Sequence, residues 1–304
     1  MSNELQILAP AKLNLFLHVV GVRSDDYHLL QSVFQYIDLC DELTLSSRED
    51  GAIRRINPIP GLPSEDDLVV RAARLLKQHT GSSFGVDIEL VKHIPMGAGL
   101  GGGSSDAASV LLGLNDLWNL NLDINELMSL GLRLGADVPF FLFGHNAFVE
   151  GIGEVLHTVK PRTASFFLVY PGVSIPTQTI FASPDLTRNH TPITINDFEE
   201  QYVAHHGLLM NDLQSIAIQI YPEVMQAIDW LESEFPGSKP RMSGSGSSVF
   251  CEISETTPIE TAMSKLPTHW QGFKVNSLVN HPAYNLKSCI DVKNVAQKGS
   301  RQVG

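Results

Sequence analysis

Hydrophobic and polar residues alternate in the first structured stretch of the chain. Between residues 9 and 19 every odd position is apolar, whereas Lys12, Asn14 and His18 occupy even positions. A period of two is typical of a β-strand, and it places Lys12 and Asn14 on the same face. The pattern predicts a strand with one buried face and one polar face. Because a lysine on a polar face is most often solvated, a functional role for Lys12 needs support from elsewhere in the chain.

The same periodicities predict the other main elements. Further strands are expected at residues 33–45, 84–94, 166–170 and 249–253. A helix capped by Asp66 or Asp67 should end near Gly81, and a second helix should run from 124 to 134 before Gly135. The polar segment 183–196 is typical of a long surface loop.

A glycine-rich segment separates the strand predicted at 84–94 from a third helix. Five glycines fall within the seven residues from 97 to 103. Several backbone N–H groups converge on a phosphate only where unusual φ values are allowed and no Cβ intrudes, and glycine meets both conditions. Ser104 and Ser105 are expected at the N-cap of the helix, whose dipole favours an anion. The segment therefore predicts a polyphosphate site.

Two known phosphate loops and a linker are the alternatives for this segment. Residues 97–102 match G-x-G-x-x-G, but a helical stretch follows where a dinucleotide fold needs a second strand and an acidic residue. Residues 97–104 fit the P-loop spacing, except that Gly103 replaces its lysine. A flexible linker is disfavoured by the adjacent strand and helix. The missing lysine makes Lys12 the candidate cation.

Composition narrows the class of protein. The chain has 304 residues, enough for two domains, and 43% hydrophobic with 18% charged residues is ordinary for a globular protein. A net charge of −12 argues against nucleic-acid binding. We expect neither a signal peptide nor a membrane span, and three isolated cysteines favour a reducing compartment, so the expected location is cytoplasmic.

Several other residues are candidates for function. Tyr27 and His28 form an aromatic pair in a polar turn, where they could stack on a ligand or cap a core edge. Asp137 precedes Val138 and Pro139, a pattern that fits an N-cap as well as a carboxylate that orients a hydroxyl. A second glycine-serine loop at 241–248 could form another wall of the same anion site.

Taken together, three motifs resemble those of the GHMP small-molecule kinases. They are Pro-Ala-Lys-Leu-Asn at 10–14, the glycine-rich segment 95–105 and Ser-Gly-Ser-Gly at 243–246. Segments 26–28, 134–139 and 171–177 further resemble the branch that phosphorylates 4-diphosphocytidyl-2-C-methyl-D-erythritol, and the resemblance extends over about residues 9–283.

The resemblance implies a two-domain α+β fold with the active site in the cleft between the domains. It implies an amino-terminal nucleotide-binding domain at 1–157 and a carboxy-terminal GHMP kinase domain at 158–285. The residues at 286–304 are poor in large apolar side chains, and this composition predicts a polar, mobile tail. The implied reaction transfers the ATP γ-phosphate to the 2-hydroxyl of the methylerythritol unit, a step of the non-mevalonate isoprenoid route. The partner is a small cytidyl diphosphate, and the protein is expected to be a monomer or a homodimer.

The resemblance also implies a role for particular residues. Asp137 is the expected base and Lys12 its cationic partner, while Asn14 helps to place the hydroxyl. Tyr27 and Phe181 would sandwich the cytosine, with His28 at its polar edge and Thr177 nearby. The expected ATP-binding residues are Pro95, Met96, Gly97, Ala98, Gly99, Leu100, Gly101, Gly102, Gly103, Ser104 and Ser105.

Magnesium would neutralise the phosphates, with Ser105 as an indirect contact. Asp67 stands where relatives commonly have asparagine, which leaves the adenosine contact open. The alternatives are a kinase of the same fold acting on homoserine, mevalonate or a sugar, a dinucleotide-dependent oxidoreductase, and a noncatalytic nucleotide-binding module.

Overall fold

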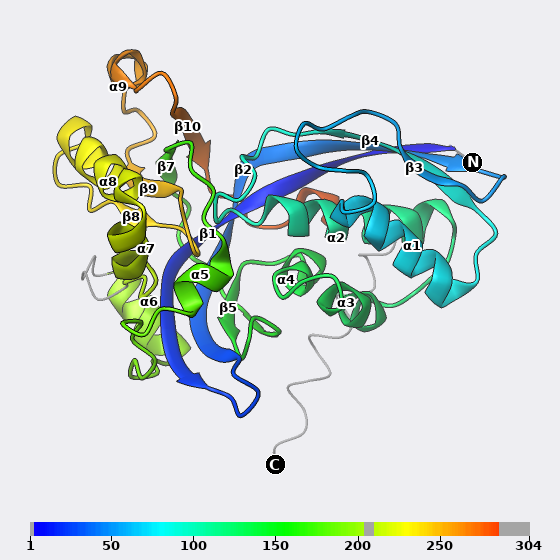
Figure 1. Cartoon of the computed structure of the whole chain (residues 1–304), viewed down its shortest axis with the longest axis horizontal. Helices are drawn as coiled ribbons and strands as arrows, with labels where there is room; N and C mark the ends of the chain where they lie inside the picture. The colour runs from blue at the N-terminus through cyan, green and yellow to red at the C-terminus, as the bar shows by residue number, and fades with distance from the viewer. Residues whose placement is uncertain (1–2, 204–209, 286–304) are drawn as a thin grey trace.

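The computed structural model describes residues 3–203 and 210–285. Two β-sheets and their helices form two lobes side by side (Figure 1). The amino-terminal lobe consists of the first sheet with helices α1–α4, and the carboxy-terminal lobe consists of the second sheet with helices α5–α9. The predicted tail at 286–304 lies outside the described residues. Among the described residues, no helix combines the length and hydrophobicity that a membrane crossing needs.

The first sheet has six strands in the order β3-β4-β2-β5-β6, with β1 paired to β2. Its strands are β1 (Glu4–Val22), β2 (His28–Arg48), β3 (Ile53–Arg55), β4 (Gly85–Val91), β5 (Ala147–Glu150) and β6 (Val155–Thr158). The pairs are antiparallel except β3 with β4. Strands β1 and β2 are longer at both ends than their hydrophobic alternation predicts, and the ends joined by their turn curve along the carboxy-terminal lobe (Figure 1).

Strand β1 differs from its prediction in one respect. Lys12 and Asn14 are only 3% and 2% exposed, so the expected polar face is buried like the apolar one. The carboxy-terminal lobe reaches this face, where the hydroxyl of Ser243 accepts a hydrogen bond from the backbone N–H of Asn14. The alternation identified the strand correctly but could not show that both faces are covered.

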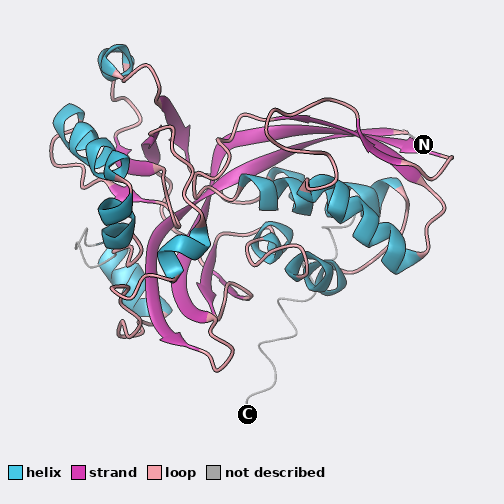
Figure 2. Cartoon of the chain, viewed as in Figure 1, coloured by secondary structure: helices cyan, strands magenta, loops and turns pink. Residues whose placement is uncertain are grey.

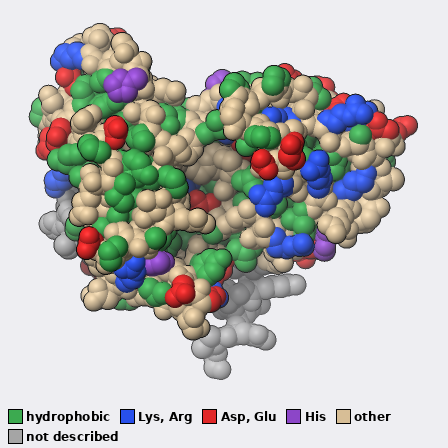
Figure 3. All heavy atoms as spheres, in the orientation of Figure 1, with side chains coloured by type: hydrophobic (Ala, Val, Ile, Leu, Met, Phe, Trp, Pro, Cys, Tyr) green, Lys and Arg blue, Asp and Glu red, His purple; other side chains and the backbone are tan. Residues whose placement is uncertain are grey.

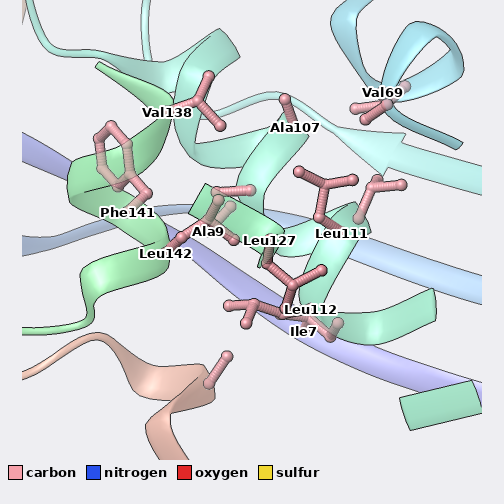
Figure 4. Packing of buried hydrophobic residues seen from close by; sticks show 14 of the residues in the cluster. Ile7, Ala9, Val69, Ala107, Leu111, Leu112, Leu127, Val138, Phe141 and Leu142 are labelled. Carbon is pink, nitrogen blue, oxygen red and sulfur yellow. The ribbon is translucent and has the colours of Figure 1, made fainter. Parts of the chain in front are cut away.

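Four helices lie on one face of the first sheet, where α1 and α2 pack against the strands and α3 and α4 pack mainly against α2 and each other (Figure 2). They are α1 (Leu68–Thr80), α2 (Gly102–Leu117), α3 (Ile124–Leu132) and α4 (Val138–Phe143). Their apolar side chains meet those of β1 in one core, which Figure 4 shows around Ile7, Ala9, Val69, Ala107, Leu111, Leu112, Leu127, Val138, Phe141 and Leu142. The core holds the start of α2 and the start of α4 in fixed positions.

The predicted helix ends are partly confirmed. Asp67 caps α1 by accepting a hydrogen bond from the N–H of Val69, and Gly81 ends α1 in the left-handed region. The prediction for α2 was wrong, because this helix begins at Gly102, before both serines. Gly101 occupies its N-cap with φ +73°, so the chain turns into the helix earlier than a serine cap would allow.

The second sheet has four antiparallel strands in the order β10-β7-β9-β8. The strands are β7 (Ser165–Tyr170), β8 (Arg241–Met242), β9 (Val249–Ile253) and β10 (Gln271–Asn276). The helices of this lobe are α5 (Thr177–Phe181), α6 (Ile195–Val203), α7 (Gln214–Ile220), α8 (Pro222–Glu234) and α9 (Glu260–Lys265), and a 3₁₀ turn, η1, spans Pro282–Asn285. The predicted loop at 183–196 runs into the start of α6.

The two lobes share buried hydrophobic contacts. One core cluster combines Leu13 of β1 with Phe166, Phe250 and Val275 of the second sheet. After β10 the chain returns to the amino-terminal lobe, where Ala283 joins its core. The two lobes therefore share a hydrophobic core along β1. The domain boundary expected between residues 157 and 158 stays a prediction.

Candidate active site

A cavity of about 450 Å³ lies where the two lobes meet. Figure 3 shows the surface hollowed between them. The structure brings together at this cavity Lys12, Asn14, Asp137, Thr177, Phe181 and the whole glycine loop from Pro95 to Ser104. Tyr27, His28 and Ser105 do not line it. Most of the residues predicted from separate motifs thus converge on one site.

The glycine loop is shaped by close contacts with the carboxy-terminal lobe. Gly97, Gly99 and Gly101 have φ values of +66°, +77° and +73°. A Cβ on Gly99 would lie 2.2 Å from the carbonyl oxygen of Ser243, and a Cβ on Gly97 would lie 1.9 Å from Oγ of Ser174. These glycines therefore serve packing between loops as well as the approach of a phosphate.

The start of α2 lines part of the cavity. Gly102, Gly103 and Ser104 form its first turn and line the cavity. The N–H groups of a first turn have no partner within the helix, and the helix dipole adds positive potential there. Gly103 has space around it, since a Cβ there would meet only Leu68 at 3.5 Å. This geometry suits a phosphate group.

Lys12 and Asp137 form an ion pair in the cavity. Nζ of Lys12 lies 3.6 Å from Oδ2 of Asp137, with side chains that are 4% and 35% exposed respectively. Burial lowers the pKa of Lys12, and the carboxylate of Asp137 opposes that shift. The side chain of Asp137 makes no capping hydrogen bond to α4. The capping alternative is therefore wrong, and the carboxylate is available to a ligand.

Hydrogen bonds connect this ion pair to strands β1 and β2, to the glycine loop and to the loop at 243–246. Nζ of Lys12 donates to Oδ1 of Asn14 and to the carbonyl oxygen of Gly99, the latter at 3.3 Å. The amide of Asn14 donates in turn to Oγ of Ser32 at 2.9 Å. The hydroxyl of Ser243 donates to the same Gly99 carbonyl at 3.2 Å. The network ties β1, the glycine loop and the loop at 243–246 into one support for Lys12.

Phe181 is an aromatic residue of the cavity lining, and His28 packs against it from outside the lining. Phe181 lines the cavity from α5, and the ring of His28 lies 4.8 Å from the ring of Phe181 at an angle of 41°. Tyr27, which precedes His28 in the chain, is 58% exposed. Oγ of Thr177 lies 2.8 Å from Oγ of Ser245. These contacts form an edge on which a planar group can stack.

The sequence did not point to a second buried charge cluster at the cavity. Nζ of Lys92 donates to Oδ2 of Asp106 at 2.6 Å and to Asp41, whose other oxygen accepts from the backbone N–H of Ile94. Burial raises the pKa of Asp106, while Lys92 opposes the shift. Burial also acts to lower the pKa of Lys92, but the two carboxylates outweigh it and raise that pKa. The only sequence signal was the position of Asp106 directly after the glycine loop.

Asp67 and Ser105 have surroundings that change their expected roles. Oδ2 of Asp67 pairs with Arg55 at 2.7 Å, while its other oxygen caps α1. The aspartate that stands where relatives commonly have asparagine is therefore paired with a buried arginine, Arg55. Ser105 is fully buried within α2, away from the cavity lining, so its geometry gives no support to a magnesium contact.

Comparison with known proteins agrees with this geometry. The profile of the GHMP kinases N terminal domain matches residues 67–145, and that of the GHMP kinases C terminal domain matches residues 197–272. Fold and cavity together define the class as a GHMP kinase. A mevalonate kinase from L. major, 16% identical with a TM-score of 0.67, shares the fold over 92% of this chain and 98% of its own.

Nearer relatives narrow the class to one family. A 4-diphosphocytidyl-2-C-methyl-D-erythritol kinase from Polynucleobacter necessarius subsp. necessarius (strain STIR1) is 53% identical over 293 residues, which cover 95% of this chain and 98% of that protein. The crystal structure of a 4-(cytidine 5'-diphospho)-2C-methyl-D-erythritol kinase matches with a TM-score of 0.77 and 32% identity, over 90% of this chain and 99% of that one. The chain belongs to the 4-diphosphocytidyl-2-C-methyl-D-erythritol kinase family.

Proposed function

We propose that this protein transfers the γ-phosphate of ATP to the 2-hydroxyl of 4-diphosphocytidyl-2-C-methyl-D-erythritol, within the non-mevalonate route to isoprenoid precursors. The observation that carries the proposal is the Lys12–Asp137 ion pair, which lies in one cavity with a phosphate-binding loop and an aromatic edge. Relatives of this chain are named as kinases of this substrate.

The proposed chemistry follows from the two charges. Asp137 accepts the proton of the 2-hydroxyl as its oxygen bonds to the γ-phosphorus, while the bond from that phosphorus to the β-phosphate oxygen breaks and releases ADP. Lys12 keeps Asp137 ionised and stabilises negative charge near the accepting oxygen. Asn14, which accepts a hydrogen bond from Lys12, positions the hydroxyl. Because phosphoryl transfer depends mainly on alignment and charge, these groups suffice for the protein's part.

The binding roles divide along the cavity. Residues 95–104 and the first turn of α2 cradle the triphosphate, while Phe181 and Tyr27 sandwich the cytosine with His28 at its edge. Thr177 lies next to this base site through its contact with Ser245. Gly103 stands where a P-loop has lysine, so another residue must supply the positive charge, and Lys12 does so through its place beside Asp137.

Magnesium enters the proposal as a companion of ATP. Within residues 3–203 and 210–285 no three His, Cys, Asp or Glu side chains gather as a metal site. Magnesium at kinase sites is bound mainly through phosphates and water with one or two carboxylates, and the residues present fit that mode. When bound, it would neutralise the phosphates, and the carboxylates that line the cavity include Asp106, next to the glycine loop, and Asp137.

Two expectations of wider organisation belong to the proposal. A nucleotide-binding domain at 1–157 and a GHMP kinase domain at 158–285 are supported by the separate sheets and by the two profile matches. A reducing cytoplasm is supported by Cys40 and Cys251, which are free thiols in the described part of the chain. A monomer or a homodimer remains the expected assembly.

A substrate panel tests the function directly. Purified protein is mixed with ATP, magnesium and either the cytidyl substrate, homoserine, mevalonate or galactose, and ADP release is measured. We expect turnover with the cytidyl substrate alone. Turnover with another alcohol would identify a different kinase of the same fold, and ATP binding without turnover of any substrate would favour a noncatalytic module. Tight NADH binding would revive the oxidoreductase hypothesis.

A further inference from the structure

We propose that Arg188 is a positioning residue that fixes which nitrogen of His28 carries the proton, and that this choice makes the base site select cytosine over uracil. The inference rests on the proposed function, because it concerns how that substrate is recognised. Arg188 belongs to the loop after α5 and was not singled out by its sequence position.

A single hydrogen bond determines the protonation pattern of His28. Nε of Arg188 donates to Nε2 of His28 at 3.1 Å. A guanidinium has only donors, so Nε2 must accept and cannot carry a proton. In the neutral ring the proton therefore lies on Nδ1. Among the described residues no hydrogen bond reaches Nδ1 of His28, so this N–H remains available to a ligand.

The guanidinium of Arg188 is itself held in place. Its Nη2 donates to the carbonyl oxygens of Phe181 at 3.1 Å and Ser183 at 2.7 Å. Its Nη1 donates to the carbonyl oxygen of Leu186 at 3.0 Å. Three carbonyls on one loop thus orient the fourth donor toward His28. This loop directly follows Phe181, the last residue of α5, so the ring of Phe181 and His28 are held by the same segment.

The charges around His28 favour its neutral form. Burial lowers the pKa of His28 and the positive charge of Arg188 lowers it further, while Asp26 acts in the opposite direction. Within residues 3–203 and 210–285, these are the two charged groups that shift the pKa of the ring. An imidazolium would also place a proton on Nε2 against the arginine donor. Near neutral pH the ring is therefore a neutral donor through Nδ1.

A neutral Nδ1–H distinguishes the two pyrimidines at N3. Cytosine has an unprotonated N3 that accepts a hydrogen bond, whereas uracil carries a proton on N3 and would oppose donor with donor. Stacking on Phe181 favours neither base, because every base has a π-face. Sites that hydrogen-bond a polar substrate group discriminate strongly against analogues that leave the group unpaired. Arg188 therefore imposes base selection without touching the base.

The test compares kcat/KM for the cytidyl substrate and for its uridyl counterpart at about pH 8, above the ordinary histidine pKa of about 6.5. The wild type should prefer the cytidyl substrate. Arg188→Ala frees the tautomer of His28 and should reduce that preference at least about tenfold, chiefly through KM. Arg188→Lys, which keeps a cationic donor, should recover part of it. Arg133→Ala, an exposed arginine at the end of α3, serves as the matched control and should preserve the preference.

Measuring the same kcat/KM ratio at acid pH distinguishes control of the His28 tautomer from simple support of the loop. A loosened loop would weaken both substrates alike and leave their ratio unchanged. Burial still lowers the pKa of His28 in Arg188→Ala, so the ratio is followed as the pH is lowered stepwise. Once the pH is below that pKa, His28 is an imidazolium that carries a proton on Nδ1 in any case, so the cytidyl preference should return.

Three results would overturn the inference alone. They are a wild type that turns over both substrates equally, an unchanged ratio in Arg188→Ala at about pH 8, and a lost ratio that acid does not restore. A wild type that turns over neither substrate would instead contradict the proposed function, so the two failures are distinguishable.

Discussion

Lys12 is a buried cation whose neighbours replace the water that it loses. Nζ reaches a carboxylate, a side-chain amide oxygen and a backbone carbonyl, and it lies 4.6 Å from the centre of the Phe34 ring. Leaving such a charge unpaired would be costly, so each neighbour also stabilises the fold. At the scale of single residues, two effects on the pKa of Lys12 oppose each other. Burial lowers this pKa and favours the neutral amine, whereas Asp137 raises it and favours the charged amine.

The first prediction concerns the proposed base. Asp137→Asn keeps the shape of the side chain but cannot accept the hydroxyl proton, so kcat should fall roughly 10²- to 10⁴-fold while KM for ATP changes little. Steady-state kinetics measure the effect, and the thermal midpoint verifies folding. Asp229→Asn, an exposed change on α8, is the control. A full kcat in Asp137→Asn would remove Asp137 from the mechanism.

The second prediction concerns alkaline pH. Below its pKa Lys12 is charged, and above it Lys12 is neutral, so activity that needs the charge is lost as pH rises through that value. Because burial lowers the pKa of Lys12, the alkaline limb of the kcat/KM profile should lie below the ordinary lysine value of about 10.4. Lys12→Arg, which stays charged, should remove this limb from the profile even if its rate is lower. The same limb in both proteins would assign it to another group.

At the scale of elements, the glycine loop joins two lobes that contribute separate parts of the cavity. Gly99 packs against the loop of Ser243, whereas Gly103 begins α2 with space around it. Both glycines belong to one motif, yet only Gly99 has a left-handed φ and a close backbone neighbour. Their consequences for stability should therefore differ.

Substituting these two glycines provides the third prediction. Gly99→Ala introduces a left-handed alanine and a Cβ 2.2 Å from a carbonyl oxygen, so the free energy of unfolding should fall by more than about 1 kcal/mol. Gly103→Ala adds an ordinary contact in a helix and should leave stability unchanged or raise it by about 0.4–1 kcal/mol. Denaturant melts compare the two. Equal losses would show that packing between the loops is not what Gly99 provides.

The short turn η1 is another element with a measurable contribution. His281 stands just before it, fully buried, and its Nδ1 accepts a hydrogen bond from the N–H of Ala283. Burial lowers the pKa of His281 to about 3. The folded protein therefore holds this histidine neutral at a pH where the unfolded chain would protonate it.

The fourth prediction follows from the sign of that shift. Between the unfolded value of about 6.5 and the folded value, the unfolded chain binds the extra proton, so stability falls as pH falls, by up to about 1.4 kcal/mol per pH unit. His281→Gln does not titrate and should show a flatter dependence. Urea melts at several pH values between these limits make the comparison. Parallel curves for both proteins would show that His281 does not cause acid sensitivity.

At the scale of the whole molecule, the shared core makes the two lobes interdependent. Leu13 of β1 contacts a cluster that includes Phe166 and Phe250 of the second sheet, all fully buried. The lobe boundary is thus a hydrophobic interior and not a polar hinge. Interfaces of this kind favour joint unfolding over independent motion of the parts.

The fifth prediction is a single unfolding transition. Trp118 reports on the first core, and Trp270 reports on the core of the carboxy-terminal lobe. The chain has three tryptophans, and in variants that keep only Trp118 or only Trp270, fluorescence should give the same denaturant midpoint. Phe250→Ala should lower both midpoints together, by about 3–5 kcal/mol in the free energy of unfolding. Separate midpoints would show that the lobes unfold independently.

Local patterns accounted for most elements and for the candidate residues. The caps of α1, the strand β7 and the glycine loop follow from residues within a few positions of one another, because turns, caps and side-chain alternation are short-range effects. The start of α2 was mispredicted because the left-handed turn at Gly101 competed with a serine cap. The roles assigned to Lys12 and Asp137 came from resemblance between motifs, not from periodicity.

Contacts between distant parts of the chain required the folded structure. Ser243 meets Gly99 across 144 residues, and Arg188 meets His28 across 160. No local spacing encodes such pairs, since they form only when β1 and the two lobes close around a common core. Residue types and their short-range order were thus enough to predict strands, helices and a phosphate loop. Long-range packing sets the solvent exposure and the hydrogen-bond partners of each group. It therefore decided that Lys12 is buried, that the side chain of Asp137 does not cap α4, and which tautomer His28 adopts.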